Sequence, residues 1–132
     1  MGKVVLDTSA WVEFERRGDK LKELNGDDEL IMSPVALGEL LVATRMKKRS
    51  ESAVAASIDY IKEVLLFATV VAVDDTTARI YADLKAASSL SGTPRGTNDL
   101  WIAATAVQHE AELLSYDRRA NFAGLPKVTV RD

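Results

Sequence analysis

Four acidic residues stand where the sequence would be expected to bind a cation. Asp7 and Asp117 follow short apolar runs that predict strands, and ligands of open α/β sheets bind at the carboxyl ends of strands. Glu39 and Asp99 each interrupt an apolar stripe at helical spacing. Four carboxylates around one pocket would repel one another unless a cation neutralised them, and Mg²⁺ and Mn²⁺ prefer such oxygen ligands. Their joint placement therefore predicts a divalent metal site.

Each of these residues also has a purely structural interpretation. Asp7, Thr8 or Ser9 could cap the helix that follows the first strand. Glu39 could reach a lysine beyond its helix end, Asp99 could stabilise the helix dipole, and Asp117 could form an Asx turn. Taken together with the other three acidic residues, Asp7 is interpreted as a ligand, and we expect Thr8 to stabilise the turn instead.

Strands and helices must alternate along the chain to bring these residues together. Apolar and β-branched runs predict strands over residues 3–6, 30–33, 69–73, 111–115 and 127–130. Apolar stripes and cap residues predict helices after Asp7 and over residues 18–25, 35–48, 54–65, 75–90 and 99–110. We therefore expect one domain over residues 1–132, a three-layer α/β/α fold on a mainly parallel sheet.

The composition narrows the possible chemistry. The 132 residues include no cysteine and a single histidine, which excludes cysteine nucleophiles, thiolate metal sites and a histidine-rich zinc site. A net charge of −3 argues against non-specific coating of nucleic acid. No apolar run approaches a secretory signal or the roughly 18 residues of a membrane span, so we expect a cytoplasmic protein without membrane contact.

Four motifs in this chain resemble one family in their order and spacing. They are DTSAWVE from Asp7, GELL around Glu39, NDLWIAATA over residues 98–106, and LLSYDRRANFAGL over residues 113–125. Together they resemble the PIN domain, and specifically the VapC toxins of bacterial and archaeal toxin–antitoxin pairs. The resemblance covers essentially the whole chain.

This resemblance implies an α/β/α fold, Mg²⁺- or Mn²⁺-dependent endoribonuclease activity on RNA such as tRNA or ribosomal RNA, inhibition by a VapB-type antitoxin, and a homodimer. It maps the catalytic and metal-binding set, with two supporting hydroxyls, onto Asp7, Glu39, Asp99, Asp117, Thr8 and Ser115. Many relatives carry a further acidic residue where this chain has Asn121, so a ligand beyond these four carboxylates is in doubt.

Hydrolysis of an RNA phosphodiester by water, rather than attack by the ribose 2′-OH, would leave 5′-phosphate and 3′-hydroxyl ends. One or two ions held by the carboxylates would acidify that water, so no histidine or cysteine is needed. Phosphate contacts are expected from basic residues near the acidic ones, although the first run could be a solvated helix end. They are Arg45, Lys47, Lys48, Arg49, Arg95, Arg118 and Arg119.

Two alternatives to an active nuclease stay open. The first is a catalytically idle PIN scaffold that only binds protein or RNA, although all four acidic residues of the family are present. The second is a receiver-like signalling domain, which also gathers acidic residues at strand ends. A receiver needs a lysine at the end of its last strand, whereas Lys127 begins the last strand expected here.

Overall fold

A parallel sheet forms the centre of the computed structural model, which describes residues 2–18, 20–46 and 48–132. Its strands in these ranges are β1 (Lys3–Leu6), β2 (Glu29–Met32), β3 (Thr69–Val70) and β4 (Glu112–Leu114), in the order β3-β2-β1-β4. Every neighbouring pair runs parallel, and Val5 of β1 pairs with Ile31 on one side and Leu113 on the other. The central strand is therefore β1.

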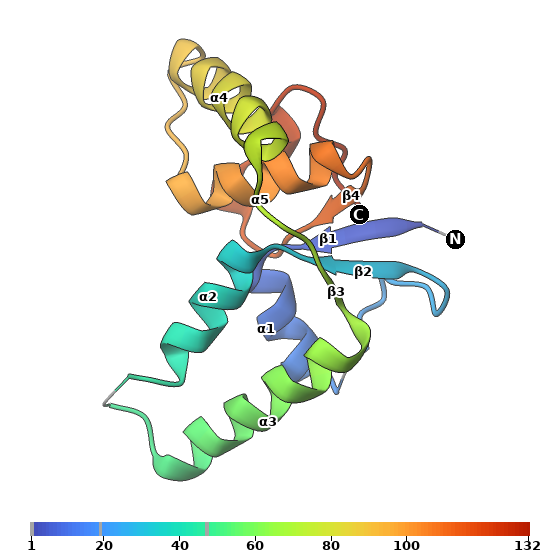
Figure 1. The fold of residues 1–132 in the computed structure, drawn as a ribbon, viewed down its shortest axis with the longest axis vertical. Coiled ribbons are helices and arrows are strands. Elements are labelled where there is room, and N and C mark those ends of the chain that lie inside the picture. Colours follow the sequence, from blue (N-terminus) through green and yellow to red (C-terminus); the bar gives the residue numbers. More distant parts are fainter. Residues whose placement is uncertain (1, 19, 47) are drawn as a thin grey trace.

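Helices cover both faces of this sheet. The helices are α1 (Thr8–Arg16), α2 (Pro34–Ala43), α3 (Glu51–Phe67), α4 (Asp75–Leu90) and α5 (Thr97–Gln108), followed by the 3-10 turns η1 (Arg118–Ala120) and η2 (Phe122–Gly124). The helix α5 packs against β1 and β4 with α4 outside it, and α1 to α3 lie on the opposite face (Figure 1). This arrangement confirms the three-layer α/β/α fold on a parallel sheet. No helix in the described ranges is long and apolar enough to cross a membrane.

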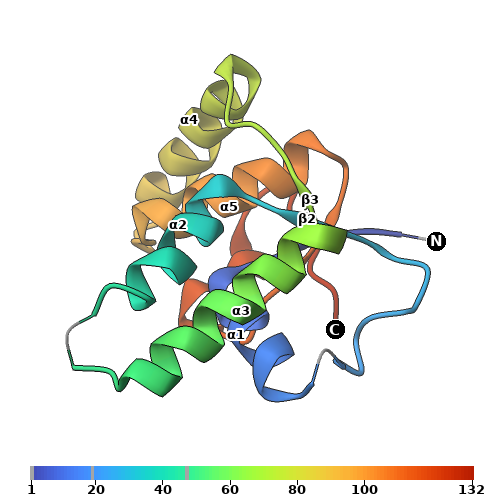
Figure 2. The same ribbon diagram turned by 60° about the horizontal axis from the view of Figure 1, so that its bottom comes forward.

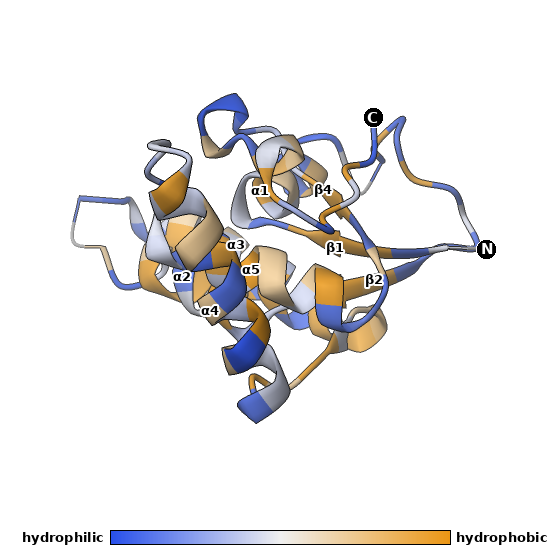
Figure 3. Cartoon of the chain, turned by 90° about the horizontal axis from the view of Figure 1, so that it is seen from above, coloured by the Kyte–Doolittle hydropathy of each residue, from blue (hydrophilic) through white to orange (hydrophobic). Residues whose placement is uncertain are grey.

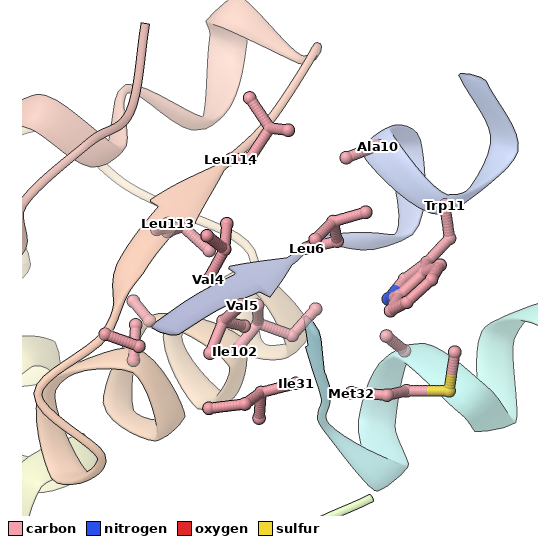
Figure 4. Packing of buried hydrophobic residues seen from close by; sticks show 14 of the residues in the cluster. Val4, Val5, Leu6, Ala10, Trp11, Ile31, Met32, Ile102, Leu113 and Leu114 are labelled. Carbon is pink, nitrogen blue, oxygen red and sulfur yellow. The ribbon is translucent and has the colours of Figure 1, made fainter. Parts of the chain in front are cut away.

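The hydrophobic core is built around β1, because its two faces are both covered. Val4, Val5 and Leu6 are fully buried, as expected for the central strand of a parallel sheet. Trp11 of α1 packs on one face and Ile102 of α5 on the other (Figure 4). Figure 3 shows the same apolar character along β1 and β4.

The face formed by α1 to α3 is joined by aromatic contacts. The α3 helix crosses in front of α1 when the molecule is turned (Figure 2). Phe67 of α3 lies 5.9 Å from Phe14 of α1 between ring centroids, and the Tyr60 hydroxyl donates to the Trp11 carbonyl at 2.5 Å. These contacts fix α1, which carries the first hydroxyls of the expected site.

Two helices differ from the sequence-based expectation. The helix expected over residues 18–25 is wrong for its described part, where residues 20–25 form turns. Tertiary contacts hold this segment instead, since the Tyr116 hydroxyl donates to the Glu23 carboxylate and Arg131 donates to the Glu23 carbonyl. The helix expected to reach residue 48 ends at Ala43, because Thr44 Oγ1 donates back to the Leu41 carbonyl at 2.7 Å.

Two strands are shorter than expected. The strand expected over residues 69–73 is limited to β3, because its partner β2 ends at Met32 and the chain turns into α2 at Pro34. The strand expected over residues 127–130 is reduced to an isolated parallel bridge between Val130 and Leu113. Lys127 has a φ of 65°, a left-handed conformation that a strand does not accommodate.

The strand order places the expected site at a topological switch point. From β1 the chain moves to β2 and β3 on one side, and it then crosses to β4 on the other side of β1. Open α/β sheets bind ligands in the crevice at the carboxyl ends of such strands. Asp7 follows β1 and its amide donates to the carbonyl of Leu114, the last residue of β4, at 3.1 Å. The two strand ends that flank the crevice are thus joined directly.

Candidate active site

Asp7 both caps α1 and lies at the carboxyl end of β1. Its Oδ1 accepts hydrogen bonds from the Ala10 amide at 2.9 Å and the Ser9 hydroxyl at 2.6 Å, and its Oδ2 accepts from the Ser115 hydroxyl at 2.5 Å. The expectation that Thr8 rather than Asp7 stabilises the turn is therefore wrong. The structural role and the proposed ligand role of Asp7 are compatible, because a carboxylate has more acceptor positions than the cap uses.

Burial raises the pKa of Asp7, whose side chain is among the few buried acidic groups of the chain. The hydrogen bonds from Ser115, Ser9 and the Ala10 amide oppose that rise in pKa, and the charge of Asp117 adds to it. Ser9 is a functional candidate that the sequence reasoning missed. Its hydroxyl also accepts from the Tyr116 amide at 2.9 Å, so it links α1 to the end of β4.

Glu39 is held by the residue that follows Asp7. Thr8 Oγ1 donates to Glu39 Oε1 at 2.6 Å, which joins the first turn of α1 to the middle of α2. The stripe that contains Glu39 is not the core face of α2, because Val42 and Met46 are more than half exposed. Glu39 is instead half-buried and lines a cleft.

Three of the predicted carboxylates line one cleft of about 440 Å³, which we call the acidic cleft. Its lining residues are Glu39, Gly96, Thr97, Asn98, Asp99 and Asp117. Asp99 lies in the first turn of α5, whose N-cap residue Gly96 offers no side-chain cap. Burial raises the pKa of Asp99, and the negative charges of Asp7, Asp117 and Glu39 raise it further, in that order. The charges of all three other carboxylates therefore act on the pKa of Asp99.

Asp117 caps the 3-10 turn η1, so the Asx-turn interpretation is also correct. Its Oδ1 accepts from the Arg119 amide at 3.0 Å, and Arg119 Nε lies 3.5 Å away. The Arg119 side chain is 94% exposed, so solvent and salt screen its attraction to Asp117. The Asp117 amide donates to Ser115 Oγ at 3.0 Å, which connects this carboxylate to the hydroxyl that also holds Asp7.

The carboxylate oxygens of Glu39, Asp99 and Asp117 are the kind of ligand that a hard divalent cation prefers. The acidic cleft offers carboxylate oxygens from three elements, and mutual repulsion raises the pKa of Asp99, a cost that a bound cation would relieve. The carboxylates surround the cleft without converging on one point. Among the described residues, no group of three acidic or histidine side chains forms a ready-made cage. Asp7 is not a lining residue of the cleft.

The basic residues expected to contact phosphate fall into two groups. Arg49 donates to the carbonyls of Ala43 and Ala53 and to Ser57, and Arg95 makes several internal hydrogen bonds, so neither guanidinium is free to bind RNA. Lys47 lies outside the described residues. The side chains left exposed to solvent are Arg45, Lys48, Arg118 and Arg119.

Asn121 adopts a left-handed conformation with a φ of 47°, which asparagine tolerates better than most residues. It does not line the acidic cleft. It lines a second hollow of about 380 Å³ that Asp117 and Arg118 also line. Its expected supporting role at the site therefore concerns the shape of the segment after Asp117, where its backbone carbonyl accepts hydrogen bonds from Arg95.

Comparisons with known proteins agree on one family. A family model described as "PIN domain" matches residues 4–127. A VapBC-5 structure from Mycobacterium tuberculosis, from the VapBC family of toxin–antitoxin systems, is 29% identical, with full coverage of both chains and a TM-score of 0.79. A search of curated proteins found no match.

Two further solved structures share the fold at lower identity. DNA-bound VapBC from Salmonella typhimurium is 20% identical with a TM-score of 0.82, covering 100% of this chain and 98% of that one. VapBC2 from Rickettsia felis, bound to a promoter DNA fragment, is 19% identical with a TM-score of 0.81, covering 98% and 97% of the two chains.

Proposed function

Because the chain belongs to the PIN-domain family, we propose that it is a metal-dependent endoribonuclease of the VapC type that hydrolyses RNA phosphodiesters. The observation that carries this proposal is the acidic cleft at the switch point of the sheet. Glu39, Asp99 and Asp117 line it together, and burial followed by the charges of neighbouring carboxylates raises the pKa of Asp99. Such a cluster favours binding of a divalent cation over burial of free charge.

In this proposal Asp99, Asp117 and Glu39 hold Mg²⁺ or Mn²⁺ from two sides of the acidic cleft, with Asp7 beside them. When bound, such an ion would neutralise charge on the phosphate and lower the pKa of a water molecule. Thr8 keeps Glu39 oriented toward the cleft through its 2.6 Å hydrogen bond, so that Glu39 can hold a water molecule or accept its proton. Ser9 and Ser115 fix the Asp7 carboxylate.

The decisive experiment is cleavage of total cellular RNA by the wild type and by Asp7→Ala, with Mg²⁺, with Mn²⁺ and with chelator. We expect metal-dependent cleavage that leaves 5′-phosphate and 3′-hydroxyl ends, and a loss of at least about 100-fold in Asp7→Ala, because the ion contributes several kcal/mol to the transition state. Circular dichroism of Asp7→Ala provides the control for folding. Metal-independent cleavage, or 2′,3′-cyclic phosphate ends, would overturn the proposal.

A VapB-type antitoxin is the partner that we propose. The VapBC structures to which this chain is similar are toxin–antitoxin systems. A groove of about 220 Å³ between α1, α2 and α3 is lined in part by apolar side chains, which suits a protein partner, and further apolar side chains are exposed elsewhere on the chain. Val12, Val42, Met46 and Ile58 are each more than a third exposed. A homodimer and a structured RNA substrate such as tRNA or ribosomal RNA stay predictions.

The two alternatives now stand differently. The match to the PIN-domain family argues against the interpretation of the chain as a receiver-like signalling domain. A catalytically idle PIN scaffold remains an outcome of the cleavage experiment, in which the wild type would bind RNA or protein without cutting. The presence of all four acidic residues supports the active enzyme.

A further inference from the structure

Arg95 connects two segments that are far apart in the sequence. Its Nε donates to the Ala120 carbonyl at 3.2 Å, and its Nη2 donates to the Asn121 carbonyl at 3.1 Å. On the other side its Nη1 donates to Ser88 Oγ at 3.0 Å and to the Thr93 carbonyl at 3.4 Å. We call this arrangement the Arg95 bridge. It comprises Arg95 and the four acceptor residues Ser88, Thr93, Ala120 and Asn121.

The two segments joined by the Arg95 bridge are those that carry acidic residues of the cleft. Arg95 immediately precedes Gly96, the N-cap of the helix whose first turn contains Asp99. Ala120 ends the 3-10 turn that Asp117 caps. In the described part of the chain, the hydrogen bonds between the 91–96 loop and residues 117–124 all come from Arg95. Besides the packing of α5 on β4, the Arg95 guanidinium is therefore the hydrogen-bonding link between the loop that precedes Asp99 and the turn that follows Asp117.

The segment after Asp117 is shaped to accept that guanidinium. A Cβ atom at Gly124 would lie 2.8 Å from Arg95 Nη2 and 2.8 Å from Asn121 Nδ2, which is closer than real Cβ contacts. The left-handed backbone of Asn121 directs its carbonyl to the same group. Gly124 and Asn121 thus both accommodate Arg95, an arrangement that an arginine serving only as a solvent-facing phosphate contact would not require.

We propose that Arg95 is a positioning residue, which sets the spacing of Asp99 and Asp117 and thereby the affinity of the acidic cleft for a divalent cation. This inference rests on the proposed function, because it needs a cation site in the cleft. Some residues do not touch a metal ion but hold its ligands in position. Their replacement typically changes metal affinity or activity by about 10–100-fold. Arg95 would act through the two backbone segments and would touch neither the cation nor the RNA.

The test is titration of purified, metal-free protein with Mn²⁺, followed by calorimetry and by the electron paramagnetic resonance spectrum of the bound ion. We expect Arg95→Met to weaken Mn²⁺ binding by about 10–100-fold and to change the spectrum of the bound ion. The matched control is Arg79→Met, because Arg79 is an exposed arginine on α4 whose ion pair is with Asp75 at 3.3 Å. The control should bind Mn²⁺ as the wild type does.

A second variant keeps the inference testable if Arg95→Met does not fold. Gly124→Ala retains the arginine but displaces the flexible end of its side chain, so it should weaken Mn²⁺ binding less than Arg95→Met does. The double variant should be no weaker than Arg95→Met alone, because removing the guanidinium makes room for the new methyl group. A folded Arg95→Met or Gly124→Ala with wild-type Mn²⁺ affinity would overturn the positioning role alone. A wild type that neither binds Mn²⁺ nor cleaves RNA would overturn the proposed function itself.

Discussion

Carboxylates gather at both ends of the parallel sheet, but they meet different partners there. At the amino ends of the strands, Arg131 donates to Asp28 at 2.5 Å and to Glu112 at 2.7 Å, and we call these three residues the Arg131 cluster. At the carboxyl ends, Glu39, Asp99 and Asp117 line the acidic cleft, where the cation within salt-bridge distance of Asp117 is the highly exposed Arg119. At the amino ends the carboxylates are paired with Arg131, whose side chain is 11% exposed. At the carboxyl ends the carboxylates of the acidic cleft face the solvent.

The pKa shifts of the two ends have opposite signs. Hydrogen bonding to Arg131 lowers the pKa of Asp28, whereas burial and like charges raise the pKa of Asp7 and Asp99. A lowered pKa means that the folded chain favours the charged carboxylate, and a raised pKa means the reverse. The comparison separates an acidic residue whose charged form stabilises the fold, Asp28, from acidic residues whose charged form is disfavoured by folding, Asp7 and Asp99.

The largest expected effect on stability comes from breaking the Arg131 cluster. Arg131→Met leaves the Asp28 carboxylate, whose side chain is 1% exposed, without its cation. We expect the free energy of unfolding to fall by about 2–4 kcal/mol, as for other buried pairs that lose one partner. Urea unfolding measures this loss. Mn²⁺ affinity of the folded fraction should stay at the wild-type value, and a parallel loss of metal binding would contradict the separation of the two ends.

An effect of opposite sign is expected at the acidic cleft in metal-free protein. Because the pKa of Asp99 is raised on folding, its contribution to stability is fully present below the ordinary carboxyl pKa of about 3.9 and is lost as pH rises through the raised value. Asp99→Asn should therefore raise the free energy of unfolding and the Tm of the metal-free protein at neutral pH. The gain should vanish near about pH 3, where the carboxyl is protonated in both states.

The control for this pH dependence is Asp28→Asn, which changes the other end of the sheet. The lowered pKa of Asp28 contributes stability that is present above the ordinary carboxyl pKa and is lost as pH falls through the lowered value. Asp28→Asn should therefore destabilise the protein at neutral pH. Urea unfolding in chelator across the acidic range measures both variants, and a fall in stability of Asp99→Asn at neutral pH would contradict the like-charge interpretation.

The smallest effect concerns the exposed arginines beside Asp117. If Arg118 and Arg119 bind phosphates, replacing both with alanine should weaken RNA binding and reduce the slope of log affinity against log salt by about 0.7 for each phosphate that is no longer neutralised. Binding to a single-stranded RNA at several salt concentrations measures this slope. Arg79→Ala serves as the control, and an unchanged slope in the double variant would remove both arginines from the RNA surface.

The pattern of strands and helices was largely predictable because it depends on local periodicity and cap residues. Ser33 followed by Pro34 begins α2 as expected, with Ser33 Oγ accepting from the Val35 amide at 3.1 Å. The helix predicted over residues 18–25 is wrong over residues 20–25, because Glu23 is held by Tyr116 and Arg131. Those two residues lie about a hundred positions away in the chain, and a local pattern contains no information about them.

The candidate site was predictable in its residue types and less so in their roles. Asp7 and Asp117 are caps as well as candidate site residues, because a carboxylate can satisfy backbone amides and keep further acceptor positions. Arg95 was expected to contact phosphate from its charge and loop position, but its donors are used inside the protein. Charge and position in the sequence do not distinguish a guanidinium that binds RNA from one that joins two loops.

The sequence alone determined the fold class and the family, and it proposed the acidic residues of the candidate site, because strand periodicity, cap residues and motif spacing are properties of short segments. Only the tertiary structure decided which carboxylates share a cleft and which have a cation partner. The strand order brings Asp7 and Asp117 to one crevice and places Asp28 and Arg131 at the opposite end of the same sheet. Electrostatic roles depend on distances across the fold, and these arise only when distant segments pack together.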